Sequence, residues 1–422
     1  MLKVLVIGNG AREHALVWKL SQSPKIAEIY AASGNAGIAT IATVLNIQPI
    51  DITALAAVAR ERKIDITVVG PEVPLAHGIV DAFGSCGLRI FGPSKAAAQI
   101  EASKVFAKEL MQKYEIPCAK SESFTSYKAA KDYVKKKRCP IVLKADGLAA
   151  GKGVIIANAT DEALTALSDI MEKRAFGDAG NSVVVEEFLV GKEVSLLAFT
   201  DGTTVVPMVP ACDYKRVGDG DTGLNTGGMG SYSPPGFFGP EMVTKIKKTI
   251  LGPVVKAMAK EGYPYKGVLY AGLMVTADGP KVMEFNCRFG DPETQAMLPR
   301  LDTDLADIML AVIDGSLKKI KIRWRNDACV GVILASGGYP GKYVTGLPIT
   351  GLDEVDDDVM VFHAGTKSKD GAICTDGGRV LTVTALGRNI AEAREKVYRN
   401  ISRINFNGCH YRRDIGQREV AG

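Results

Sequence analysis

The chain has 422 residues, of which 46% are hydrophobic and 23% charged, and its formal net charge is +5. This length suits about three domains, and the composition is typical of a globular enzyme. The net charge is small for this length, whereas nucleic-acid binding usually needs basic residues concentrated on one face, so we expect anionic small molecules and no nucleic acid as partners. No apolar run approaches the roughly 18 residues of a membrane span, so we expect no membrane partner either.

The eight cysteines and four histidines show no C-x-x-C pair and no metal-binding spacing. Neither a disulfide framework nor a zinc site is therefore predicted. The chain passes from Met1 directly into a strand, without the apolar core and cleavage site of a signal peptide. We expect a cytoplasmic protein.

Residues 1–103 read as an open parallel α/β domain. An apolar strand at 3–7 runs through a glycine turn at 8–10 into a helix, an arrangement that binds anions through free N–H groups and the helix dipole. The dinucleotide fingerprint G-x-G-x-x-G would need a third glycine at position 13, which is Glu13. A single phosphate on a sugar fits better than NAD.

Three further strands are predicted in this domain, at residues 29–32, 64–69 and 88–91. Glycine-rich or proline-rich loops follow two of them, at 33–37 and 70–75. Ligands of open parallel sheets sit beyond the carboxyl ends of the strands, where these loops lie. Tight connections between strands and helices also use such glycines. Glu72, which lies between two prolines, is the residue of these loops for which we most expect a functional role.

Residues 104–325 form the second predicted domain, entered through one helix at 96–114 that carries Glu101, Lys104 and Lys108. Strands at 140–144 and 154–156 flank a glycine-rich run containing Lys152. Such a loop can fold over a triphosphate, since glycines admit the phosphates and lysines supply charge. It is not a Walker loop, because a glycine follows the lysine and a strand comes next. Glycine-rich loops between strands are common and do not by themselves identify a nucleotide site.

Two later stretches of this domain are also candidates. Residues 183–193 read as an apolar strand that breaks into an acidic linker. Backbone groups of this segment can pair with the edge of an adenine. A plain strand followed by a turn explains the pattern about as well. Residues 213–232 are too polar and glycine-rich for core, and long loops are usually functional or disordered. We expect this second stretch to close over substrate.

Residues 281–293 hold the pattern on which the functional prediction depends. In a strand, alternation puts Val282, Glu284, Asn286 and Arg288 on one face and apolar side chains on the other. Mg²⁺ takes one or two carboxylate or amide oxygens and fills its other positions with phosphate and water. The alternative is a surface strand with solvated charges.

Residues 326–422 read as a small mixed α+β domain. Strands are predicted at 328–335, 359–364 and 378–385, and a helix at 390–404. The sequence of this region by itself predicts no catalytic or binding residue.

Five motifs together resemble the ATP-grasp ligases, and within them the phosphoribosylamine–glycine ligases of purine biosynthesis. They are G-N-G-A-R-E-H-A at 8–15, G-P-E-V-P-L at 70–75, K-A-D-G-L-A-A-G-K-G at 144–153, N-T-G-G-M-G at 225–230 and E-F-N-C-R-F-G-D-P-E at 284–293. The resemblance implies a central ATP-grasp fold with a mobile lid at about 122–192. It also implies a monomer that joins glycine to 5-phosphoribosylamine through glycyl phosphate, giving glycinamide ribonucleotide, ADP and phosphate.

The resemblance further implies roles for individual residues. Glu284 and Asn286 would hold Mg²⁺ or Mn²⁺ on ATP. ATP itself would contact Lys104, Lys144, Gly147, Gly151, Lys152, Gly153, Glu186, Glu187, Phe188, Leu189 and Glu193. The implied catalytic residues are Arg288, Lys215, Asp291 and Gly228. The other substrates would contact Gly8, Gly10, Arg12, Glu13, Asn35, Gly37, Pro71, Glu72, Asp213, Asn225, Thr226 and Gly227.

The sequence departs from the family pattern at Ala11, where a second glycine is common, and at Ala32-Ser33, where proline often stands. Alanine would be strained at position 11 if that residue needed a positive φ. Two rival functions stay open. One is another ATP-grasp carboxylate–amine or carboxylating ligase; the other is an NAD-linked or non-catalytic nucleotide-binding protein, against which Glu13 counts.

Overall fold

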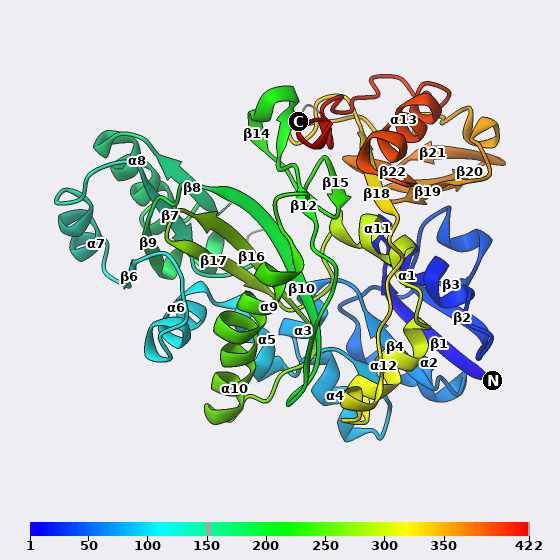
Figure 1. The fold of residues 1–422 in the computed structure, drawn as a ribbon, viewed down its shortest axis with the longest axis horizontal. Helices are drawn as coiled ribbons and strands as arrows, with labels where there is room; N and C mark the ends of the chain where they lie inside the picture. The colour runs from blue at the N-terminus through cyan, green and yellow to red at the C-terminus, as the bar shows by residue number, and fades with distance from the viewer. Residues whose placement is uncertain (149–152, 421–422) are drawn as a thin grey trace.

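The computed structural model describes residues 1–148 and 153–420 and has three domains (Figure 1). The first is built on a five-stranded parallel sheet of order β3-β2-β1-β4-β5. Its strands are β1 (Leu2–Gly8), β2 (Ile26–Ser33), β3 (Thr43–Leu45), β4 (Ile66–Val69) and β5 (Ile90–Phe91). Its helices are α1 (Ala11–Ser21), α2 (Ile52–Glu61), α3 (Glu72–Ala76) and α4 (Ile79–Ser85). As expected of a parallel sheet covered on both faces, residues 4–7 are wholly buried.

The helix predicted at 96–114 is broken, and the prediction of one helix was wrong. The structure has α5 (Lys95–Ala102) and α6 (Lys104–Lys113), with Ser103 between them at φ −128° and ψ 115°. Ser103 Oγ accepts a hydrogen bond from Phe106 N over 3.0 Å, as a helix N-cap does, and donates to Asp146 Oδ1 over 3.0 Å. This break allows Lys104 Nζ to reach the carbonyl oxygen of Gly147 at 2.7 Å.

The central domain contains two antiparallel sheets. The first, the lid sheet, has the order β6-β9-β7-β8 and its own hydrophobic core beneath α7 and α8. It comprises β6 (Ser121–Phe124), α7 (Tyr127–Val134), β7 (Ile141–Ala145), β8 (Val154–Ala157), α8 (Thr160–Met171) and β9 (Val183–Glu187). Figure 1 shows this unit extending to one side of the molecule.

The second sheet, of order β11-β10-β16-β17, lies between the lid sheet and the first domain. Its strands are β10 (Lys192–Asp201), β11 (Val205–Pro207), β16 (Lys266–Thr276) and β17 (Gly279–Asn286). The accompanying helices are α9 (Pro240–Ile246), α10 (Gly252–Lys260), α11 (Glu293–Met297) and α12 (Leu305–Ile313).

A β-bulge corrects the predicted alternation in β17. Gly272 pairs with Glu284 but the next residue, Leu273, pairs with Val282, so Met283 is an extra residue in the ladder. A bulge shifts the side-chain phase by one residue. Val282 is therefore buried with Leu273 and not on the polar face, whereas the predicted polar alternation of Glu284 and Asn286 beyond the bulge stands.

The C-terminal domain is a five-stranded antiparallel sheet of order β12-β15-β18-β22-β19. Two of the strands in this sheet, β12 (Cys212–Asp213) and β15 (Gly230–Ser233), come from the central part of the chain. The others are β18 (Ala328–Ala335), β19 (Val359–His363) and β22 (Arg379–Gly387), with α13 (Ile390–Ile401) against the sheet. Two hairpins project from it, β13 (Arg216–Gly218) with β14 (Thr222–Asn225), and β20 (Thr366–Lys369) with β21 (Ala372–Thr375). The loop predicted at 213–232 thus ends in a buried strand, because residues 230–233 pair with β18.

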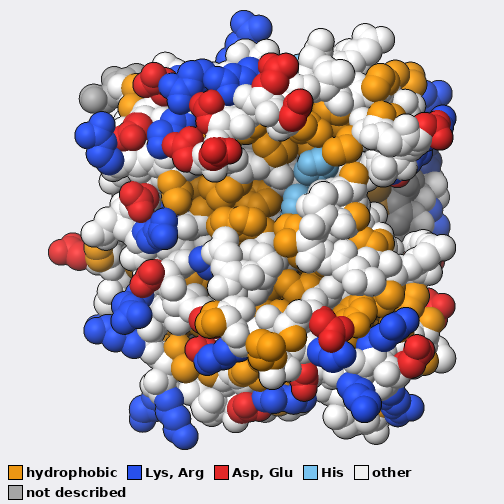
Figure 2. Space-filling model, turned by 90° about the vertical axis from the view of Figure 1, so that its right-hand side faces the viewer, with side chains coloured by type: hydrophobic (Ala, Val, Ile, Leu, Met, Phe, Trp, Pro, Cys, Tyr) orange, Lys and Arg blue, Asp and Glu red, His pale blue; other side chains and the backbone are white. Residues whose placement is uncertain are grey.

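The C-terminal domain meets the first domain where β19 packs against α1. His363 N donates to His14 Nδ1 over 2.8 Å, and the two rings lie 5.6 Å apart. The side of the molecule where these domains meet carries a hollow in which hydrophobic and histidine side chains gather (Figure 2). Every helix in the two described ranges is too short or too polar to cross a membrane.

Candidate active site

Glu284 is a carboxylate surrounded by lysines from three parts of the chain. Burial opposes its ionisation, but the charges of Lys215, Lys144 and Lys104 outweigh that cost and lower the pKa of Glu284. Burial likewise opposes the charge of Lys215, but Glu193 and Glu284 raise its pKa. Lysines gathered from three parts of the chain can also contact an anion such as a triphosphate.

Glu284 and Asn286 fit a magnesium site that is completed by a ligand. They lie on one face of β17, two residues apart, and both are only partly buried. In the described ranges no group of three or more His, Cys, Asp or Glu side chains could hold a metal ion. A carboxylate and an amide are the hard oxygen donors that Mg²⁺ or Mn²⁺ accepts when phosphate and water supply the rest.

Lys144 joins the lid sheet to β17. Its Nζ donates to the carbonyl oxygen of Met283 over 2.9 Å and lies 3.1 Å from Glu186 Oε1. The other oxygen of Glu186 is 3.2 Å from Lys108 Nζ. The Glu186 carboxylate, which is buried, is therefore held between two lysines, and sequence reasoning had assigned Lys108 no role.

The glycine-rich loop between β7 and β8 is described at its two ends. Gly147 has φ +153°, and a Cβ there would lie 2.8 Å from Ala179 Cβ, so a glycine is needed. The carbonyl oxygen of Gly153 accepts from Ala145 N over 2.9 Å. Gly151 and Lys152 lie outside the described residues.

The linker after β9 runs from the lid sheet to β10. Glu187 Oε1 accepts from Lys120 N over 3.0 Å, while Phe188 is exposed and Leu189 partly buried. Glu193 Oε2 lies 2.8 Å from Lys215 Nζ. The residues predicted to bind the nucleoside thus lie along the connection between the two sheets of the central domain.

Arg288 links β17 to the first domain. Its Nε lies 3.1 Å from Glu72 Oε2 and its Nη2 lies 3.2 Å from Glu101 Oε1. Glu101 also accepts from Cys287 N over 2.7 Å. Burial raises the pKa of Glu101, whereas for Glu72 the charges of Arg288 and Arg12 outweigh burial and lower the pKa. Sequence reasoning gave Glu101 no role, since nothing in a helical pattern marks its partner.

Arg379, on β22 of the C-terminal domain, is a site residue that sequence reasoning missed. Its Nη2 lies 2.8 Å from Asp291 Oδ2, and its Nη1 donates to the carbonyl oxygens of Gly227 and Asp291. Gln295 Nε2 donates to Asp291 Oδ1 over 2.7 Å. Burial opposes ionisation of Asp291, but Arg379 and Arg12 lower its pKa. No motif surrounds Arg379, so only the fold could identify it.

Asp213 presents a carboxylate oxygen that has no hydrogen-bond partner among the described residues. Its Oδ1 is buried, and a Cβ on Gly228 would lie 2.7 Å from it. Burial and the neighbouring Glu293 raise the pKa of Asp213 well above its usual range. Glu293 is itself held by Ser195 and Tyr270, at 2.8 and 2.6 Å. A cationic group would satisfy Asp213.

The glycine loops of the first domain are braced from within. Glu13, 2% exposed, accepts from Gly10 N over 2.6 Å and pairs with Arg12 Nε at 2.6 Å. Gly8 has φ +122°, and a Cβ there would lie 2.7 Å from Glu13 Cγ. The Glu13 side chain therefore supports the turn from inside. Pro71 precedes α3 in extended conformation and directs Glu72 toward Arg288.

The loop after β2 is tied to the C-terminal domain. Asn35 Nδ2 donates to the carbonyl oxygens of Asn9 at 2.8 Å and His363 at 2.7 Å. A Cβ on Gly37 would lie 2.3 Å from His14 Cε1. Asn35 and Gly37 thus fix the position of this loop.

The two departures from the family pattern have local explanations. Ala11 is the first residue of α1 and has no positive φ, so alanine is unstrained there. Ser33 has φ +74°, a conformation closed to proline.

The loop before β15 is ordered by its own contacts. Thr226 Oγ1 donates to Lys215 O over 2.9 Å and accepts from Gly228 N over 3.0 Å, and Asn225 is exposed. The structure therefore brings Lys215, Gly227 and Gly228 to the side of the site that also holds Asp291 and Arg379.

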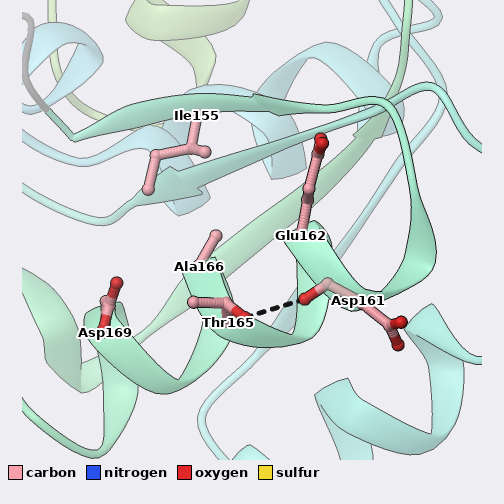
Figure 3. Close-up of a pocket in the computed structure, with 6 residues that line it drawn as sticks. All are labelled: Ile155, Asp161, Glu162, Thr165, Ala166 and Asp169. Carbon is pink, nitrogen blue, oxygen red and sulfur yellow. Dashed lines mark hydrogen bonds between the residues drawn. The ribbon is translucent and has the colours of Figure 1, made fainter.

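A hollow of about 450 Å³ between β8 and α8 is unrelated to this site (Figure 3). Its polar lining consists of Thr165 and the carboxylates of Asp161, Glu162 and Asp169. Thr165 Oγ1 donates to the carbonyl oxygen of Asp161 over 2.8 Å. With carboxylates and no basic group in its lining, it suits no phosphate-bearing ligand.

The lid sheet, the second sheet with its lysine-faced carboxylate and amide, and the parallel first domain define the ATP-grasp class of ligases. Three profiles of one family match: Phosphoribosylglycinamide synthetase N domain at residues 2–101, ATP-grasp (A) domain at 102–294 and C domain at 329–418. The chain belongs to this family, also named the phosphoribosylamine–glycine ligases.

Individual relatives agree with that assignment. The chain is 53% identical to the phosphoribosylamine–glycine ligase of Caldanaerobacter subterraneus subsp. tengcongensis over 98% of this chain and 99% of that protein. It is 50% identical to that of Halalkalibacterium halodurans over 100% and 98%. The crystal structure of the Thermotoga maritima phosphoribosylamine–glycine ligase matches with a TM-score of 0.86 and 33% identity, over 98% of this chain and 100% of that one.

Biotin carboxylase from Campylobacter jejuni also matches, with a TM-score of 0.76 at 14% identity over 100% of this chain and 95% of that one. At this identity the likeness shows the shared fold alone. It does not extend to the activity.

Proposed function

We propose that this chain joins glycine to 5-phosphoribosylamine at the expense of ATP. The observation that carries the proposal is the polar row on β17, where Glu284 is surrounded by Lys104, Lys144 and Lys215 and Asn286 follows it on the same face. Beyond the strand, Arg288 contacts Glu72 of the first domain and Asp291 contacts Arg379 of the C-terminal domain. The row offers binding groups for a metal-bound triphosphate at one end and for a small carboxylate at the other.

The reaction has two steps in this proposal. A carboxylate oxygen of glycine attacks the γ-phosphorus of ATP, the bond to the bridging oxygen breaks, and ADP leaves. The amine nitrogen of 5-phosphoribosylamine then attacks the acyl carbon of glycyl phosphate, the C–O bond breaks, phosphate leaves, and the nitrogen loses a proton. Phosphoryl transfer asks for positioning and charge and for little covalent chemistry from the protein, which agrees with a site made of lysines, arginines and carboxylates.

The residues at the nucleotide end hold ATP in this proposal. Glu284 and Asn286 hold Mg²⁺ or Mn²⁺, which when bound neutralises charge on the phosphate oxygens. Lys104, Lys144 and the glycine loop with Gly147 and Gly153 contact the phosphates. The linker from Glu186 to Leu189 and Glu193 contacts the nucleoside, with backbone groups as the main donors because the Glu186 carboxylate is already paired.

The residues at the other end hold glycine. Asp213 Oδ1, which has no hydrogen-bond partner in the part of the chain that the structure describes, accepts from its ammonium group, and Arg288 and Arg379 attract its carboxylate. Gly228 leaves the space between Asp213 and Pro292 open, since a Cβ there would lie 2.4 Å from Pro292 Cδ.

The turns at Gly8, Gly10 and Pro71 face the phosphoribosyl group in this proposal, with Glu13 as their brace. We also propose that the enzyme acts as a cytoplasmic monomer.

The test is ADP release from ATP–Mg²⁺ with glycine, measured with and without 5-phosphoribosylamine. We expect ADP, phosphate and glycinamide ribonucleotide in equal amounts when both substrates are present. Replacing glycine by bicarbonate or formate separates this activity from a carboxylating or other ATP-grasp ligase. Product with bicarbonate, and none with glycine, would overturn the proposal. Binding of NAD without binding of ATP–Mg²⁺ would do the same.

A further inference from the structure

Residues 214–230 form a long hairpin that we call the substrate hairpin. Its base is closed by two backbone hydrogen bonds, from Tyr214 N to Gly230 O at 3.0 Å and from Met229 N to Tyr214 O at 2.8 Å. The hairpin carries Lys215, which faces Glu193 and Glu284, and the glycines that contact Arg379. Its position therefore sets the geometry of the glycine end of the site.

The outer part of the substrate hairpin cannot hold itself by burial. Residues 219–225 are all exposed, and Leu224 is 65% exposed. A two-stranded hairpin by itself is marginally stable in water. Its position must therefore be fixed by contacts with another part of the chain.

Arg412, in the segment after α13, supplies the central contact. Its Nη1 donates to the carbonyl oxygen of Arg216 over 3.0 Å and to Asp221 Oδ1 over 2.9 Å. Its Nε and Nη2 donate to the two oxygens of Asp414 over 2.8 and 2.6 Å. Its guanidinium lies 4.6 Å from the ring centre of Tyr214, at the base of the hairpin.

The neighbours of Arg412 reinforce this contact. Three further hydrogen bonds join residues 410–414 to the hairpin: Arg413 N to Asp219 Oδ1 at 2.8 Å, Gly220 N to Asp414 Oδ2 at 2.9 Å, and His410 Nε2 with Val217 O at 2.9 Å. Residues 410–414 therefore contact the first strand of the hairpin, β13, and its turn at residues 219–221.

The Arg412 side chain is fully buried, which is rare for an arginine. A buried guanidinium is stable only when its donors are satisfied, and here two carboxylates and a carbonyl satisfy them in the forked geometry that lysine lacks. The same forked contacts join the C-terminal domain to the substrate hairpin.

We propose that Arg412 is a positioning residue for the ligase reaction, acting through the substrate hairpin on Lys215, Gly227 and Gly228. This inference rests on the proposed function for its kinetic part. The C-terminal domain then serves catalysis by setting the position of the glycine end of the site. Loss of Arg412 releases the hairpin and weakens use of glycine, while ATP, held by β17 and the lid sheet, is bound as before.

The test compares Arg412→Ala, Arg412→Lys and Asp221→Ala with the wild type, using the full chain. Amide hydrogen exchange of residues 218–226 is measured without substrates, and steady-state kinetics are measured for glycine and for ATP. In Arg412→Ala we expect faster hairpin exchange and a loss in kcat/KM for glycine of roughly 10- to 100-fold, on the scale of an ångström-sized misplacement. The KM for ATP should stay within about twofold, because Lys104 and Lys144, which contact the phosphates in the proposed function, are not held by the hairpin and keep their contacts.

The other variants make the result decisive. Arg412→Lys keeps the charge without the fork and should fall between wild type and Arg412→Ala. Asp221→Ala removes the hairpin carboxylate that pairs with Arg412 and with Arg418, but it keeps the buried arginine and its bonds to Asp414 and to the carbonyl oxygen of Arg216. It should therefore show the same effects if Arg412→Ala fails to fold. Arg403→Ala is the matched control, since Arg403 bonds to Asp356 within the C-terminal domain and should leave both measurements unchanged.

Unchanged exchange in the hairpin would overturn the inference, as would faster exchange with unchanged kcat/KM for glycine. If the wild type forms no glycinamide ribonucleotide, the proposed function fails. Faster amide exchange in the variants would then still show that Arg412 holds the substrate hairpin in position.

Discussion

Lys144 donates from its Nζ to the carbonyl oxygen of Met283 over 2.9 Å, at the bulge of β17. A bulge leaves its extra residue outside the regular ladder. Lys144, in β7, donates a hydrogen bond to the carbonyl oxygen of that residue. The contact ties the lid sheet to the strand that carries Glu284. It also places the Lys144 charge where it helps to lower the pKa of that carboxylate.

The first prediction concerns Glu284. Glu284→Gln keeps the shape of the side chain but removes the charge that a metal ion needs. We expect kcat to fall by roughly 10²-fold or more, the scale of losing one electrostatic stabiliser. The measurement is turnover against Mg²⁺ concentration. Glu162→Gln, in the hollow beside α8 (Figure 3), is the control and should turn over normally. Near-normal turnover of Glu284→Gln would show that the metal assignment is wrong.

The second prediction concerns Arg379. Arg379→Ala leaves Asp291 without its partner at 2.8 Å and frees the carbonyl oxygen of Gly227. We expect kcat/KM for glycine to fall by about 10²-fold, because a charge-assisted donor is lost beside the proposed glycine site. Arg379→Lys should recover only part of the activity. Steady-state kinetics check this prediction. The control is Arg388→Ala, because the Arg388 side chain is 88% exposed and its loss should leave the kinetics unchanged. Unchanged use of glycine in Arg379→Ala would exclude this role.

The third prediction concerns the loop after β2. In Gly37→Ala the new methyl group would lie 2.3 Å from His14 Cε1 and 2.6 Å from His363 Cδ2, so the domain contact must shift. We expect a loss of about 1–3 kcal/mol in the free energy of unfolding, typical of overpacking.

The control for Gly37→Ala is Gly84→Ala in α4, where no described heavy atom lies within 4 Å of the new methyl group. It should be neutral or stabilising by up to about 1 kcal/mol. The measurement is the free energy of unfolding of both variants in denaturant. Equal values for the two variants would contradict the predicted clash.

The fourth prediction concerns the pH dependence of stability. Burial, with the charge of His363, lowers the pKa of His14 from 6.5 to about 3, and burial lowers that of His363 from 6.5 to about 4. Below pH 6.5 the unfolded chain therefore binds protons that the folded chain does not. The stability from these histidines is fully present above 6.5 and is lost as pH falls toward the folded values. Each histidine contributes a slope of up to about 1.4 kcal/mol per pH unit.

The measurement is the free energy of unfolding between about pH 7 and about pH 5, for the wild type and for His363→Gln and His14→Gln. Each variant lacks one titrating group, so its stability should depend less steeply on pH than that of the wild type. Parallel curves for the wild type and both variants would contradict the assignment of buried neutral histidines.

Local patterns in the sequence predicted most strands, and the structure confirms the expected fold class. The apolar run at 328–335 became β18 with the predicted ends, and the alternation of Glu284 and Asn286 survives in β17. The break at Ser103 and the bulge at Met283 were missed. Each depends on a contact with a distant element, Asp146 for the serine and Lys144 for the bulge.

The sequence by itself determined the family, because strand alternation and glycine turns are encoded within a few neighbouring residues. It also predicted which residues hold nucleotide and metal. Only the tertiary structure decided that Arg379 faces Asp291, 88 positions away, and that Arg412 holds a hairpin some 190 positions before it. Such partners are chosen by how the domains pack, and no local pattern of charge or polarity carries that information.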